Sequence, residues 1–173
     1  STLTSGLEDV LFDDGKYTAA FDGESYSGGA FITQFRRRGR NWGFTVDYDQ
    51  VDPSYRTETG YDPWNDYRNF SAYSWYNFYI DGGIFERITP QIYTDGKWSF
   101  GNVNKWKRIN FSIDHHLRFA QTYFMVSFGT GSEFWAGTDY DNLWDFDLNF
   151  GSSLSSKIGY DVFFSRERNV ARW

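Results

Sequence analysis

The side chains best suited to catalysis or metal binding lie in the segment 106–119, WKRINFSIDHHLRF. Arg108, Asp114 and His116 occupy one set of alternate positions, whereas His115 falls among the apolar residues of the other set. Adjacent residues of a strand point to opposite faces, so the two histidines cannot bind one metal ion together. The segment is therefore interpreted as a long strand with one apolar and one charged face, and not as a histidine metal site.

The acidic stretch 138–147, TDYDNLWDFD, is a second candidate site. Carboxylates at alternate positions can gather a calcium ion, which takes about six to eight oxygen ligands. Asp139 and Asp141 would be among the ligands, but the stretch lacks the glycine and the closing glutamate of a recognised calcium loop. We expect no cofactor, with calcium at these two residues as the alternative. Residues 129–142 are expected to form a glycine- and acid-rich loop.

One basic cluster, formed by Arg36, Arg37, Arg38 and Arg40, lies at a tight connection between two expected strands. Such a cluster could contact lipid phosphates or an anionic polysaccharide at a membrane interface. It could equally be a charged hairpin tip that discourages pairing between sheet edges. The net charge of −6 argues against general nucleic-acid binding.

Motifs for catalysis are missing from the sequence. It contains no nucleophile elbow, phosphate-binding loop, dinucleotide-binding glycine motif or zinc-protease motif. A glycosidase needs two carboxylates about 5–9.5 Å apart, and no spacing selects a pair among the acidic residues. We therefore expect that the protein is not an enzyme.

Period-two alternation predicts an all-β fold of about ten antiparallel strands with short turns. Asp81-Gly82-Gly83 and Asp95-Gly96 are typical of hairpin turns. Pro90 predicts an edge, a bulge or a break at the middle of the strand over 84–94. The segment 67–81 is aromatic on both faces, so its orientation stays open.

Composition and strand length favour a membrane wall over a soluble domain. Aromatic residues make up 23% of the chain, yet the mean hydropathy is −0.63, because polar residues alternate with the apolar ones. The sequence contains no run of about 18 apolar residues, which a transmembrane helix would need. A transmembrane strand needs only about 9–11 residues, and aromatic girdles mark its two ends. We predict one domain over 1–173, an antiparallel transmembrane β-barrel or a segment of one.

In such a barrel the polar strand faces would line a wet interior. These side chains would hold water and form salt-bridge ladders between neighbouring strands. The candidates that the alternation places on polar faces are Asp47, Asp49, Arg108, Asp114, His116, Arg118, Asp145 and Asp147.

The stretch 44–68, FTVDYDQVDPSYRTETGYDPWNDYR, resembles part of an uncharacterised family of outer-membrane β-barrel domains. Members follow a family-9-like carbohydrate-binding module. They carry an acidic and an aromatic residue, an Arg-Thr and Gly-Tyr turn, and a Tyr-Arg pair, which here would be Asp52, Tyr55, Arg56-Thr57, Gly60-Tyr61 and Tyr67-Arg68. Ser54-Tyr55 replaces the family's Gly-Phe. The resemblance implies an outer-membrane barrel with a link to glycans and no established activity, of which this chain would be a C-terminal portion.

The sequence thus predicts a protein of the bacterial outer membrane that acts as a pore, a translocation scaffold or a surface anchor. Its expected partners are outer-membrane lipid and, beyond that, other envelope proteins or glycans, without nucleic acid. The alternative is a soluble β-sandwich that binds glycans on aromatic platforms. Sugar rings would then stack on Trp64, Trp98, Trp135 or Trp144.

Overall fold

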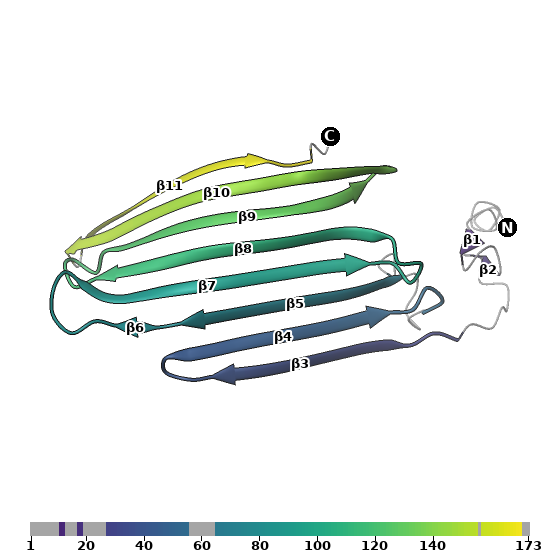
Figure 1. Cartoon of the computed structure of the whole chain (residues 1–173), viewed down its shortest axis with the longest axis horizontal. Helices are drawn as coiled ribbons and strands as arrows, with labels where there is room; N and C mark the ends of the chain where they lie inside the picture. Colours follow the sequence, from purple (N-terminus) through teal and green to yellow (C-terminus); the bar gives the residue numbers. More distant parts are fainter. Residues whose placement is uncertain (1–10, 13–16, 19–26, 56–64, 156, 171–173) are drawn as a thin grey trace.

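A computed structural model of the chain describes residues 11–12, 17–18, 27–55, 65–155 and 157–170. These residues form an all-β structure (Figure 1). Its strands are β1 (Leu11–Phe12), β2 (Tyr17–Thr18), β3 (Ala30–Arg38), β4 (Trp42–Val51), β5 (Tyr67–Tyr76), β6 (Phe78–Tyr79), β7 (Phe85–Trp98), β8 (Asn104–Leu117), β9 (Tyr123–Trp135), β10 (Thr138–Ser155) and β11 (Ile158–Arg168). Within the described residues no helix is long and apolar enough to cross a membrane.

Strands β3 to β11 make one antiparallel nine-stranded sheet, while β1 pairs with β2. The order across the large sheet is β11-β10-β9-β8-β7-β5-β4-β3, and the short β6 continues β5 along the side of β7. Apart from β6, each strand of this sheet pairs with the strands that precede and follow it in the chain. The described sheet is open, with β3 and β11 at its opposite edges (Figure 1).

The strand registers divide the side chains into two faces of opposite character. Directly paired residues lie on the same face, so each register carries the alternation of one strand to the next. We call the first face the apolar face: Phe31, Phe35, Trp42, Phe44, Val46, Tyr48, Phe70, Tyr76, Ile92, Ile109, Phe111, Ile113, Phe124, Val126, Phe128, Trp144, Phe146, Leu148, Phe150, Tyr160, Val162 and Phe164. The opposite face, rich in Asp, Asn, Gln, Ser and Arg, is the polar face. The registers also orient β5, which is ambiguous from sequence: Phe70 belongs to the apolar face, and Tyr73 and Trp75 to the polar face.

No second layer packs against the apolar face within the described part of the chain. Val51 and Val170 are the buried hydrophobic residues among them, and no described side chain is less than 2% accessible. Phe111 is 50% exposed although it lies on β8, near the middle of the sheet. The chain has an accessible surface of 12175 Å², whereas a compact monomer of 20.3 kDa exposes about 8,800 Å². A large hydrophobic surface therefore faces outward.

Two of the expected turns are wrong, and both errors involve glycine. Asp95-Gly96 lies inside β7, and the turn after this strand comes at residues 99–103. Gly96 fits the strand because the ring of Trp98 lies where its side chain would be. The expected loop 129–142 is instead the end of β9, a tight turn at Ala136 and Gly137, and the start of β10. Both turn residues have positive φ, 50° and 81°, as a two-residue hairpin turn requires.

Pro90 lies within β7, in the interior of the sheet, and of the three predicted alternatives the local break is the one that the structure has. The paired ladder on one side of β7 stops between β5 and β6, opposite Pro90, which has no N–H to donate. Asn77 fills this break. Its side-chain oxygen accepts from Thr89 at 2.9 Å, and its amide nitrogen donates to the carbonyl of Arg40 at 2.9 Å. The break thus keeps its polar groups paired while it admits a proline.

Candidate functional site: the polar face of the sheet

The polar face brings together most of the side chains that alternation predicted to line a wet surface. Seven of the eight lie on the polar face of β4, β8 or β10, namely Asp47, Asp49, Arg108, Asp114, His116, Asp145 and Asp147. Arg118 is the exception, because it follows the end of β8. Its guanidinium donates to the carbonyl of Ile80 and so ties two turns together.

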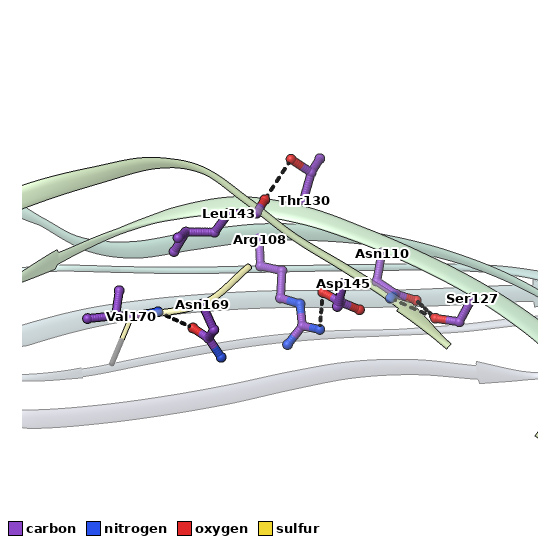
Figure 2. Close-up of polar contacts among 8 residues, drawn as sticks. All are labelled: Arg108, Asn110, Ser127, Thr130, Leu143, Asp145, Asn169 and Val170. Carbon is purple, nitrogen blue, oxygen red and sulfur yellow. Dashed lines mark hydrogen bonds and ion pairs between the residues drawn. The ribbon is translucent and has the colours of Figure 1, made fainter. Parts of the chain in front are cut away.

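Hydrogen bonds between neighbouring strands run along this face. Their partners include carboxylates, amides and hydroxyls, and the pairs are Gln34–Asp47 at 2.5 Å, Asn69–Asp49 at 2.9 Å, Tyr73–Gln91 at 2.5 Å, Gln91–Asp114, Trp106–Asp95 at 2.5 Å and Asn110–Ser127 at 2.9 Å (the last drawn in Figure 2). Salt-bridge ladders were predicted between neighbouring strands. The contacts in these pairs are instead hydrogen bonds in which one partner is charged or both are neutral. Each such bond contributes about 0.5–3 kcal/mol net, depending on whether a partner is charged.

One ion pair on this face spans three strands. Arg108 Nη2 on β8 lies 2.6 Å from Asp145 Oδ1 on β10, above the backbone of β9 (Figure 2). The intervening positions of β9 are Gly129 and Gly131. A methyl group on Gly129 would collide with the Asp145 carboxylate. Glycine in the middle strand is what allows the two charged side chains to meet.

The same arrangement recurs one strand further along. Tyr123 on β9 donates its hydroxyl to Asp161 Oδ1 on β11 at 2.7 Å. Gly151 of β10 lies between them, and a methyl group there would collide with both side chains. Two contacts between non-adjacent strands thus depend on glycine in the strand between. They stiffen the sheet across its width, because each joins three strands.

A cavity of about 490 Å³ opens around the ion pair. Its lining has charges of both signs and three aromatic residues, and it includes Tyr93, Asp95, Trp106, Arg108, Asp145 and Glu167. Trp106 is held by its hydrogen bond to Asp95, and the Lys97 ammonium lies 5.0 Å from its ring centroid. The lining therefore offers hydrogen-bond donors and acceptors to polar groups.

The basic cluster lies at one end of the sheet, at the β3–β4 turn. Its side chains do not converge on one point. The Arg37 guanidinium lies 4.6 Å from the ring centroid of Trp42, and that of Arg40 lies 5.2 Å from the ring of Tyr79. Arg36 and Arg38 alternate with Arg37, so they project from the polar face. Contact with lipid phosphates or a polysaccharide stays a prediction, as does the role of a repulsive hairpin tip.

The metal candidates are dispersed over the sheet. Asp139 and Asp141 lie in β10, beside an irregular register between Tyr140 and Leu143. No group of three or more His, Asp or Glu side chains in the described part of the chain could hold a metal ion. The two histidines point to opposite faces, as alternation predicted. His115 stacks on Phe124 on the apolar face, with ring centroids 4.2 Å apart.

The tryptophans proposed as a glycan platform do not share one surface. Trp144 belongs to the apolar face, and so does Trp98, which covers Gly96. Trp135 ends β9 beside the tight turn, on the opposite face. Trp64 lies outside the described residues.

Sequence reasoning missed several functional partners on the polar face. Gln34, Asn69 and Gln91 each pair with a predicted carboxylate, and Tyr123 pairs with Asp161. Alternation could have placed them on this face, but their partners follow only from the register.

Comparisons with protein-family models, curated proteins and solved structures gave no match to the chain. The resemblance of residues 44–68 to an outer-membrane barrel family therefore stays a prediction.

Proposed function

We propose that the sheet is a wall of a β-barrel in the bacterial outer membrane, with its apolar face in lipid and its polar face toward a water-filled interior. The protein would act there as a pore, a translocation scaffold or a surface anchor. The observation that carries this proposal is the outward-facing apolar face, which crosses every strand from β3 to β11.

The amount of exposed apolar surface supports a hydrocarbon environment. Phe35, Phe111, Phe128 and Phe164 are between 48% and 67% exposed, on strands spread across the sheet. Contiguous exposed apolar patches above a few hundred Å² are rare on soluble monomers. Transfer of a phenylalanine side chain out of water stabilises the folded state by about 1.5–3 kcal/mol, so lipid contact over this face would contribute strongly.

Strand length and connectivity fit the same environment. The strands from β7 to β10 contain 13 to 18 residues. A tilted strand needs about 9–11 residues to cross the hydrocarbon core, so these strands are long enough. Eight strands follow one another across the sheet in an up-and-down order. Membrane barrels have this order and even strand numbers in bacteria.

The polar face suits the interior of such a wall. Its cavity and its hydrogen-bonded rows offer donors, acceptors and charges of both signs. A water-filled lumen would keep these groups hydrated, whereas contact with lipid would leave them unsatisfied. Conduction or passage of polar solutes is thus the role that this face supports best.

Insertion into lipid tests the proposal. The purified chain, unfolded in urea, is diluted into phospholipid vesicles, which are then floated on a density gradient and washed with alkaline carbonate to remove adsorbed protein. We expect the chain to float with the vesicles and to resist the wash. In the absence of lipid or detergent we expect aggregation, because the described residues leave the apolar face exposed.

A monodisperse, soluble monomer that stays at the bottom of the gradient would contradict the proposal. Glycan binding would then be the next activity to assay, with soluble oligosaccharides.

A further inference from the structure

Among the described residues, the two edge strands of the sheet have no pairing partner on their outer sides, and their side chains are complementary. Every residue of β3 and of β11 is exposed. β3 and β11 are the first and last of eight successive antiparallel strands, so they run in opposite directions (Figure 1). An antiparallel ladder can therefore form between them. We propose that β3 of one chain pairs with β11 of a second copy, and that two copies close a sixteen-stranded barrel through two identical junctions.

The register of this junction is set by two highly exposed apolar residues that the edge strands carry on the polar face. Ile32 on β3 is 80% exposed, and Phe163 on β11 is 63% exposed. Their partners within the chain, Asp49 and Asn149, place both of them on the polar face. If Ile32 lies directly opposite Phe163, each apolar side chain covers the other.

The same register matches the other side chains along both strands. On the apolar face, Phe31 meets Phe164 and Phe35 meets Tyr160, which gives two aromatic pairs. On the polar face, Gln34 meets Asp161. The Gln34 amide already donates one N–H to Asp47, and its second N–H is available for another carboxylate. A slip by one residue would exchange the two faces, and a slip by two would place Ile32 or Phe163 against a polar residue.

The tilt of the apolar surface supports this register independently. A row of directly paired residues begins at Phe35 on β3 and ends at Arg168 on β11, beyond the apolar part of that strand. The apolar surface thus crosses the rows diagonally. If Phe35 pairs with Tyr160, the apolar surface becomes continuous across the junction. Tyr160 lies eight residues before Arg168 on β11, so the register shifts by eight residues over eight strands, which corresponds to a strand tilt of about 35°. Tilts of about 35–45° are typical of membrane barrels.

The size of the polar-face side chains favours two copies over self-closure. An eight-stranded barrel is only just wide enough for its interior side chains. Here Tyr73, Trp75, Tyr93, Trp106 and Tyr123 all project from the polar face of central strands. Barrels of about sixteen strands leave an aqueous channel, into which such residues can extend. Two chains related by a two-fold axis along the barrel would form one.

Cysteine cross-linking tests the junction, because the chain contains no native cysteine. One preparation carries Ile32→Cys and another carries Phe163→Cys, and the two are mixed unfolded, folded together into vesicles and oxidised. We expect disulfide-linked dimers on a non-reducing gel from the mixture, and none from either preparation alone. A mixture of Ile32→Cys with Phe164→Cys is the matched control. It should not cross-link, because Phe164 lies on the opposite face.

This inference rests on the proposed membrane location, and flotation of the same variants separates the two. Variants that float but give no dimer would overturn the pairing of two copies and leave the membrane proposal intact. The double variant Ile32→Cys/Phe163→Cys gives a further readout. A cross-linked monomer, recognised by its faster migration, would show that β3 pairs with β11 of the same chain and would overturn the pairing of two copies.

Discussion

Replacement of Phe111 by arginine is expected to lower the free energy of unfolding of the membrane-embedded protein by about 2–4 kcal/mol. Phe111 lies on the apolar face, with Ile92 and Phe128 paired on its two sides. An arginine near the middle of a lipid-facing strand costs about this much, because its charge leaves water for hydrocarbon. Urea unfolding in vesicles, followed by tryptophan fluorescence, measures the change.

Ser112→Arg is the matched control for this variant. Ser112 is the next residue of β8 and faces the polar side, where a guanidinium stays hydrated. Its effect should be small. An exposed phenylalanine on a water-facing surface would tolerate arginine within about 0.5 kcal/mol. Equal, small effects of the two substitutions would therefore contradict a lipid-facing role for the apolar face.

The second large effect is expected at Gly131. A methyl group there would collide with the backbone carbonyl of Lys107 on β8, and a backbone group cannot rotate away. Gly131→Ala should therefore force β8 and β9 apart, at a cost of about 1–3 kcal/mol, and should weaken the adjacent ion pair between Arg108 and Asp145. The free energy of unfolding is again measured by urea titration.

Two other glycines act as graded controls. The three atoms nearest to the methyl group of Gly129→Ala would all belong to the Asp145 side chain, which can swing aside. The loss should then stay within about 1 kcal/mol, the value of a solvent-accessible ion pair, since the Arg108 side chain is 49% exposed. At Gly159 the nearest atom would be 3.5 Å away, so Gly159→Ala should be neutral or slightly stabilising. Equal losses at all three sites would contradict the steric explanation.

Alternation along the sequence predicted the parts of the fold that depend on one strand at a time. The all-β class, the antiparallel order and the two-faced character of β8 are confirmed. Asp47 and Asp145 also lie on the face that alternation assigned to them. Side-chain direction in a strand has a period of two, so it can be predicted without knowledge of the neighbouring strands.

Features that depend on contacts between strands were not accessible in this way. Gly96 lies inside a strand because Trp98 covers it, and the break predicted at Pro90 is filled by Asn77, which lies between β5 and β6. The local sequence at Gly96 is typical of a turn, and the sequence around Pro90 does not identify the residue that fills the break. The ion pair of Arg108 with Asp145 joins residues 37 positions apart and needs glycine in a third strand. None of these follows from a window of neighbouring residues.

The orientation of β8 in a bilayer is the central claim, and a nitroxide scan along this strand tests it most directly. Single cysteines at positions 108–114 carry the spin label, and collision rates with oxygen and with a water-soluble nickel complex are measured in vesicles. We predict that Ile109, Phe111 and Ile113 respond to oxygen, which concentrates in lipid, and that Asn110 and Ser112 respond to nickel. High nickel accessibility at both sets of positions would place the apolar face in water and contradict the membrane wall.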